Sequence, residues 1–271
     1  MGWECRPPAQ DGVRYFDSPD GSDVSYPDEG LSVLGADGGA GFWFDHRAAA
    51  VRRHLETIRP SSMWEVGAGN GAMAKRLSGS VVEIVTVEPI AAGAQAAAAL
   101  GFASLCARLE DLHLPDDSIP SVGVFDVLEH VEDPTPLVRE MYRVRMPGGT
   151  VFATVPAHDI MWGDEDDVAG HYRRYTRSML EAQFTGHGFV LFGSEHLFAC
   201  LLPAAALLRA LPYRLGRRST REAVLQRMRG QLAPAPRADR LARAALAAES
   251  AVSKKVPLPF GLSLLGVFCK R

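Results

Sequence analysis

Cysteine is scarce in this sequence, and neither sign of charge dominates. The 271 residues include four cysteines, which form no CxxC pair and are too scattered for a disulfide framework: Cys5, Cys106, Cys200 and Cys269. We therefore expect reduced thiols in a cytoplasmic protein. The formal net charge of -3 argues against nucleic-acid binding through a surplus of basic residues, so no nucleic acid is expected as a partner.

A hydrophobic run long enough to cross a bilayer is also missing. The most apolar stretch, Leu197 to Leu208, contains Pro203 and is followed by Arg209. It falls short of the roughly 20 residues that a membrane-spanning helix needs. The first residues, MGWECRPPAQDG, lack the basic and then apolar pattern of a signal peptide. We expect a protein without a transmembrane segment.

The order of the remaining elements indicates a sheet covered by helices. Residues 1–41 are rich in Gly, Asp, Ser and Pro without periodicity, which predicts an irregular arm. A helix is expected from Phe42 to Ile58, and strand-like and helix-like segments then alternate from SMWEVG to TVFATVP. Such alternation is typical of a parallel sheet with sites at the carboxyl ends of its strands. We expect a core over 42–196, a helical cap over 197–255 and a terminal strand over 256–271.

The segment MWEVGAGNG places three glycines, Gly67, Gly69 and Gly71, between a strand and a helix. Such a turn lets a ligand lie directly on backbone amides at a helix N-terminus. A tight turn without a ligand is a poor explanation for three glycines, and a dinucleotide-binding GxGxxG loop would need its third glycine at Ala72. Glu88 ends the next strand, where a carboxylate can accept both hydroxyls of a ribose.

Glu65 stands two residues before the GxGxG spacing, and together with later segments this pattern resembles the class I S-adenosylmethionine-dependent methyltransferases. The segments FDVLEHVEDP, MYRVRMPGGTVFATVP and GDEDDVAGHYRRYT follow the order of a small-molecule branch with LEH and GHxRRY motifs. The resemblance covers residues 42–192, and PLPFGLSLLGVFCK is similar to the last strand pair of that branch. It implies a Rossmann-like α/β fold with a seven-stranded, mostly parallel sheet and helices on both faces. It also implies S-adenosyl-L-methionine as the cofactor, and we expect no metal ligands.

The resemblance places cofactor contacts at the strand ends and in the first helix. The expected cofactor-binding residues are Trp43, Arg47, Glu65, Gly67, Gly69, Glu88, Pro89, Leu109, Glu110, Phe125 and Asp126. The family usually has an acid and a small residue at the adenine loop, where this chain has Arg108 and Leu109, so Glu110 or a backbone amide is left to contact the adenine. Trp43 and Phe44 are either core anchors or a lid over the cofactor, with Arg47 reaching its carboxylate, and we favour the lid.

The candidates for catalysis are His130, His171 and Tyr175. Methyl transfer is an in-line displacement from an activated sulfonium, so alignment matters most, and a base is needed only for acceptors of high pKa. We expect His130 nearest to the methyl group, as a base with an ordinary pKa of about 6.5. The alternative is that His130 only orients Glu129 or the loop. Asp166 and Arg174 are expected to pair across a loop.

These expectations describe an enzyme that methylates an oxygen or nitrogen of a small molecule. The Ala- and Arg-rich composition is common in GC-rich genomes, which favours a natural-product intermediate of secondary metabolism, such as an antibiotic. One alternative is methylation of a saccharide or lipid-linked intermediate at a membrane face, with the apolar and then basic segment 197–255 as a surface element. Another is a cofactor-binding regulatory protein without turnover. A homodimer is also left open.

Overall fold

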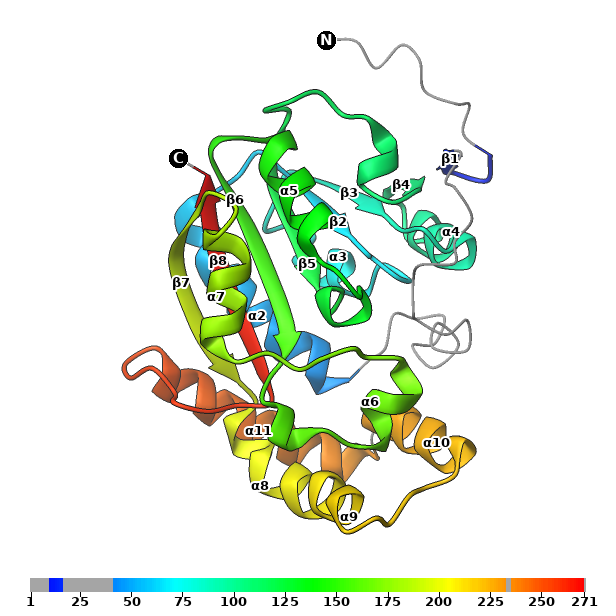
Figure 1. The fold of residues 1–271 in the computed structure, drawn as a ribbon, viewed down its shortest axis with the longest axis vertical. Helices are drawn as coiled ribbons and strands as arrows, with labels where there is room; N and C mark the ends of the chain where they lie inside the picture. The colour runs from blue at the N-terminus through cyan, green and yellow to red at the C-terminus, as the bar shows by residue number, and fades with distance from the viewer. Residues whose placement is uncertain (1–9, 17–40, 233–234, 271) are drawn as a thin grey trace.

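A mixed eight-stranded sheet runs through the computed structural model, which describes residues 10–16, 41–232 and 235–270 (Figure 1). The strand order is β1-β4-β3-β2-β5-β6-β8-β7. All neighbouring strands are parallel except for β8, which is antiparallel to both β6 and β7. The strands are β1 (Val13–Tyr15), β2 (Ser62–Val66), β3 (Glu83–Val87), β4 (Ala103–Cys106), β5 (Ile119–Phe125), β6 (Arg145–Pro156), β7 (Phe189–Leu197) and β8 (Ser263–Lys270).

Helices connect the strands and cover both faces of the sheet. The α-helices are α2 (Phe42–Ile58), α3 (Ala72–Leu77), α4 (Ala91–Ala99), α5 (Thr135–Val144), α6 (Asp164–Ala169), α7 (Arg177–Thr185), α8 (Leu202–Ala205), α9 (Leu211–Arg214), α10 (Arg221–Leu232) and α11 (Pro236–Ser253). Shorter turns are η2 (Glu110–Leu112), η3 (Leu128–His130), η4 (Asp159–Met161), η5 (Ala199–Leu201) and the π-helical η6 (Ala206–Ala210). None of the helices in the described ranges is both long and apolar enough to cross a membrane.

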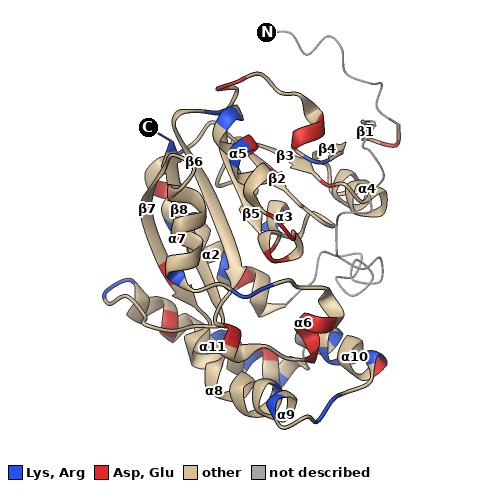
Figure 2. Cartoon of the chain, viewed as in Figure 1, with Lys and Arg blue, Asp and Glu red and all other residues tan. Residues whose placement is uncertain are grey.

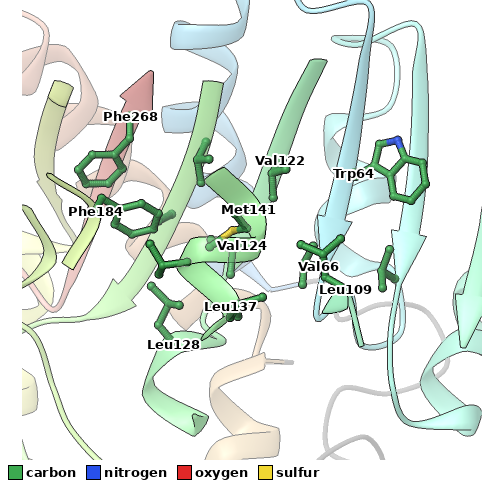
Figure 3. Close-up of a cluster of buried hydrophobic side chains, with 14 of the residues drawn as sticks. Trp64, Val66, Leu109, Val122, Val124, Leu128, Leu137, Met141, Phe184 and Phe268 are labelled. Carbon is green, nitrogen blue, oxygen red and sulfur yellow. The ribbon is translucent and has the colours of Figure 1, made fainter. Parts of the chain in front are cut away.

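Two hydrophobic clusters fill the space between the sheet and its helices. On one face α5 and α7 bury Leu137, Met141 and Phe184 against strand residues such as Val124 and Phe268 (Figure 3). On the other face α2, α3 and α11 pack against the same strands. Burial of apolar area on both faces stabilises the central strands and fixes where their carboxyl ends lie.

The predicted irregular arm, residues 1–41, lies mostly outside the described residues. Within residues 10–16, β1 pairs in parallel with β4 and adds an eighth strand to the seven that we expected. Val13 is fully buried, and the Gln95 side chain donates a hydrogen bond of 2.9 Å to the Tyr15 hydroxyl. A three-residue strand carries almost no periodic signal, so only its partner in the sheet reveals it.

The helical segment between β7 and β8, α8 to α11, lies at the carboxyl end of the sheet (Figure 1). Acidic residues of α6 face basic residues of this segment (Figure 2). Arg209 and Arg227 contact Glu165 at 3.1 and 3.2 Å, and Arg218 contacts Asp167 at 3.0 Å. The arginines that cluster in the sequence therefore serve, in part, to attach these helices to α6.

Candidate functional site

One cavity of about 970 Å³ opens at the carboxyl ends of the central strands. It extends from the glycine loop after β2 to the turn after α6, and Ala205, Arg209 and Met228 of the helical segment line its far side. The expected cofactor-binding residues all line this cavity, together with His130 and His171: Trp43, Arg47, Glu65, Gly67, Gly69, Glu88, Pro89, Leu109, Glu110, Phe125 and Asp126. Tyr175 does not line it.

The glycine loop has the backbone that its sequence predicts. Gly67, Gly69 and Gly71 have φ angles of 68°, 52° and 77°, a region that glycine enters without steric cost. A Cβ atom at Gly67 would lie 2.4 Å from a methyl group of Val127, so no side chain fits there. Gly71 is the N-cap residue directly before α3, and the loop therefore presents backbone N–H groups at a helix N-terminus.

Glu88 lies at the end of β3 and braces this loop. Its carboxylate accepts hydrogen bonds from the backbone N–H of Gly69 at 2.7 Å and of Ile90 at 2.9 Å. Burial raises the pKa of Glu88, and the two N–H donors oppose that rise. Each carboxylate oxygen has a second lone pair, which leaves room for a ribose hydroxyl.

Gly93 in α4 is a residue of this site that the sequence reasoning missed. A Cβ atom at this position would lie 2.8 Å from Cγ of Glu88 and 3.0 Å from the carbonyl oxygen of Gly69. Gly93 thus lets α4 approach the loop closely. A signal was present, because Gly93 interrupts an otherwise alanine-rich helix.

Glu65 is buried beside the glycine loop. Burial raises the pKa of its carboxyl to about 8. A hydrogen bond from the backbone of Ala74 lowers this pKa, and the charge of Glu88 raises it further. Its Oε2 is buried and accepts no hydrogen bond from the described part of the chain. An acceptor of this kind fits an ammonium group, which the methionyl part of S-adenosyl-L-methionine carries.

The first helix contributes both core and cavity wall. Trp43 stacks on Phe198 with ring centroids 3.8 Å apart, and Phe44 belongs to a hydrophobic cluster. Arg47 forms an ion pair of 2.5 Å with Asp126, which directly follows β5 with a φ of 54°. Trp43 and Phe44 thus act as anchors and line the cavity at the same time.

The expected adenine region lies after β4. Leu109 is fully buried, and burial raises the pKa of Glu110. Arg108 pairs with Asp111 at 3.0 Å. The cavity is therefore walled here by an apolar side chain and by a half-buried carboxyl group.

His130 and His171 meet in the lining of the cavity, with ring centroids 4.7 Å apart. Burial lowers the pKa of His130 to about 3, and the neighbouring His171 adds to this effect. This pKa lies well below the ordinary value of about 6.5 expected for His130, because burial disfavours the charged ring. His171 is held through Nδ1, which lies 2.8 Å from Oδ1 of Asp166.

Tyr175 occupies a structural position, contrary to the catalytic role expected for it. Its hydroxyl donates a hydrogen bond of 3.2 Å to the carbonyl oxygen of Leu128. Its backbone pairs with Pro156 and His158 at 2.9 Å each, and burial raises the pKa of the phenol. Tyr175 thus joins the ends of β5 and β6 from behind the cavity wall.

Asp166 and Arg174 form the ion pair that the sequence predicted. The Arg174 guanidinium donates to both carboxylate oxygens of Asp166, at 2.8 and 3.0 Å, and to the carbonyl oxygen of Ala157 at 3.1 Å. Both charged side chains are buried. The pair fixes the loop that carries His171 against the end of β6.

Comparisons with known proteins agree with this architecture. Residues 64–153 match the family model described as a methyltransferase domain. A search of curated protein sequences found no match. The solved structure of the YcgJ protein from Bacillus subtilis is 18% identical with a TM-score of 0.52, and the match covers 83% of this chain and 99% of that chain.

Two further solved structures show how varied the proteins with this fold are. Phosphoethanolamine N-methyltransferase 2 of Haemonchus contortus, solved with S-adenosyl-L-methionine, is 16% identical with a TM-score of 0.54, covering 91% of this chain and 58% of that chain. The cyclase SpnF is 17% identical with a TM-score of 0.50, covering 82% and 81%. Identities this low show a shared fold only. With the family match, the fold is that of a Rossmann-like methyltransferase, and the match to the methyltransferase domain covers residues 64–153.

Proposed function

Because the chain is an S-adenosylmethionine-dependent methyltransferase, we propose that it methylates an oxygen or nitrogen atom of a small molecule, such as an intermediate of secondary metabolism. The observation that carries this proposal is the single cavity that joins the glycine loop to the two histidines. Sites for small molecules have volumes of roughly 300 to 1,000 Å³. A cavity of about 970 Å³ therefore suits the cofactor together with a small acceptor.

The residues around the glycine loop would bind the cofactor. Backbone N–H groups of the loop and the carboxylate of Glu65 would contact the methionyl part, and Arg47, which lines the same cavity, would bind its carboxylate. Glu88 would accept the ribose hydroxyls, and Leu109 and Glu110 would border the adenine. The buried Oε2 of Glu65, which lacks a donor among the described residues, supports this orientation.

The other end of the cavity would bind the acceptor. S-adenosyl-L-methionine supplies an already activated methyl group, so the task of the chain is to align the acceptor atom and to exclude water. His130 is buried, which lowers its pKa, and His171 is held by Asp166, so both rings would position the acceptor. The helical segment that contributes Arg209 and Met228 would close the site over it.

Calorimetry with S-adenosyl-L-homocysteine tests the cofactor site. We expect Glu88→Ala to weaken binding by about 1 to 3 kcal/mol, roughly 5- to 150-fold, because hydrogen bonds between the carboxylate and the ribose are lost. Glu83→Ala, at the exposed start of the same strand, is the matched control and should bind like the wild type. Wild-type affinity in Glu88→Ala would show that the Glu88 carboxylate does not contact the cofactor.

An acceptor screen that measures S-adenosyl-L-homocysteine formation then separates an enzyme with turnover from a cofactor-binding regulatory protein. Tight cofactor binding would favour the regulatory alternative if none of the hydroxyl or amine acceptors led to S-adenosyl-L-homocysteine formation.

A second candidate acceptor, a saccharide or lipid-linked intermediate, is favoured by an exposed apolar patch near α9. Leu207, Leu208 and Leu215 are 64%, 74% and 62% exposed, and Arg214 and Arg217 are exposed beside them. Apolar side chains flanked by basic ones suit the surface of an anionic membrane. Sedimentation with anionic vesicles, compared with neutral ones, decides whether this patch binds lipid.

A further inference from the structure

Three side chains of metal-binding type meet in the lining of the cavity: Glu129, His130 and His171. One donor atom from each lies within 4.8 Å of the other two, and all three residues line the cavity. They come from η3 and from the turn after α6, segments that are far apart in the sequence. The backbone N–H of Tyr172 donates a hydrogen bond of 2.8 Å to the carbonyl oxygen of Glu129 and holds the two segments together.

Neighbouring groups orient both histidine rings. Nδ1 of His171 lies 2.8 Å from Oδ1 of Asp166, and the ring of His130 hydrogen-bonds to the backbone of Ala169. Histidines that bind metals almost always have such a partner on the ring nitrogen that does not contact the metal. Asp166 is fixed in turn by Arg174 at 2.8 Å. The two rings are thus held in the way that metal ligands require.

The two arginines whose charges act on Glu129 each already form an ion pair with an aspartate. Arg47 pairs with Asp126 at 2.5 Å, and Arg174 pairs with Asp166. Glu129 is a third carboxylate, only 1% exposed, and its Oε2 accepts no hydrogen bond within the described ranges. A buried carboxylate is costly unless a positive charge or hydrogen bonds compensate it. A divalent cation would supply that charge.

We propose that Glu129, His130 and His171 bind a divalent transition-metal ion, of the class of Zn²⁺, Mn²⁺ or Fe²⁺, which holds a hydroxyl group of the methyl acceptor. Two imidazoles and one carboxylate suit these ions, whereas Mg²⁺ and Ca²⁺ prefer oxygen ligands. Three protein ligands leave coordination positions open toward the cavity. The inference rests on the proposed methyl transfer and narrows its acceptor to a hydroxyl.

A metal ion at this place removes the need for a basic side chain. Coordination to a divalent ion lowers the pKa of a bound hydroxyl strongly, as it does for water. The hydroxyl proton passes to water, and the acceptor oxygen then forms a bond to the methyl carbon. The bond between that carbon and the sulfonium sulfur breaks, and its electron pair stays on sulfur, which becomes the neutral thioether of S-adenosyl-L-homocysteine.

Titration with Co²⁺ followed by visible absorption tests the metal site without an acceptor. The full-length chain, free of any histidine tag and treated with a chelator, should bind one Co²⁺ with absorption bands typical of nitrogen and oxygen ligands, and Zn²⁺ should displace it. Asp166→Asn should weaken Co²⁺ binding by about 10- to 100-fold, because it removes the partner that orients His171. Glu129→Gln and His171→Ala should weaken it further.

His113→Asn is the control, because His113 is exposed, lies outside the cavity and has a φ of 46°, which asparagine tolerates. It should bind Co²⁺ like the wild type. Absence of the Co²⁺ bands in the wild-type chain, or equal affinity in the wild type and Glu129→Gln, overturns the metal site. Binding of S-adenosyl-L-homocysteine, measured on the same samples, tests the proposed function separately. Cofactor binding without Co²⁺ binding overturns the metal site alone.

Discussion

Replacing Asp166 with asparagine removes the charge from the ion pair that holds the His171 loop. The Asp166 carboxylate interacts with Arg174 at 2.8 and 3.0 Å and with His171 at 2.8 Å, and it accepts a hydrogen bond of 2.8 Å from the N–H of Gly163. In Asp166→Asn the guanidinium of Arg174 stays buried without its counter-charge. Breaking one side of a buried ion pair costs about 3 to 5 kcal/mol. We expect a loss near 3 kcal/mol, because the carboxamide oxygen keeps part of the hydrogen bonding.

The pH dependence of this loss has a definite sign. Burial raises the pKa of the Asp166 carboxyl, but the hydrogen bond with His171 and the charge of Arg174 outweigh it and lower the pKa from 3.8 to about 2. This depression corresponds to about 2 kcal/mol of folding stability. Because the folded-state pKa lies below the unfolded one, the contribution is fully present above pH 4 or so and is lost as the pH falls through about 2. The difference between variant and wild type should therefore shrink over this window.

Urea unfolding followed by circular dichroism at pH 7 and pH 3 measures both effects. Asp167→Asn is the control, since the Asp167 side chain is 47% exposed and its ion pair with Arg218 is open to solvent. We expect a change within about 0.5 kcal/mol for the control. A loss in Asp166→Asn that is no larger than in Asp167→Asn would refute the reasoning, as would a loss that grows on acidification.

Two further predictions concern the cofactor end of the cavity. Gly67→Ala should lower the free energy of unfolding by more than Gly79→Ala, because both glycines have positive φ but only the Cβ at position 67 overlaps Val127; equal losses in urea unfolding would show that the overlap relaxes. Glu65 has a pKa of about 8, so at pH 7 the binding of S-adenosyl-L-methionine, whose ammonium lowers that pKa, should release up to about one proton. Calorimetry in buffers of different ionisation enthalpy measures this release, and Glu65→Gln should abolish it; an unchanged release in that variant contradicts the placement of Glu65.

The cofactor end of the site could be predicted because its signals are local. The strand, the glycine loop and the helix at 62–77 are consecutive, and Gly67, Gly69 and Gly71 must adopt backbone angles that few other residues reach. The helix expected from Phe42 to Ile58 has the same bounds in the structure, because its apolar spacing and the following Pro60 define it without reference to the rest of the chain. The position of Glu88 could be predicted for the same reason, because this residue directly follows a strand rich in β-branched residues.

The sequence by itself thus determined the alternation of strands and helices, the glycine loop and the acids at the strand ends, since each depends on neighbours a few residues away. The tertiary structure alone decided which distant side chains meet. The sequence spacing does not show that His171 lies close to Glu129 and His130, because the folding of the segment between them decides that distance. Likewise the pKa of His130 depends on its burial and on the neighbouring His171, and the place of Tyr175 depends on the hydrogen bond from its hydroxyl to Leu128. Contacts across long loops and the desolvation that they cause are properties of the packed chain, and no local pattern encodes them.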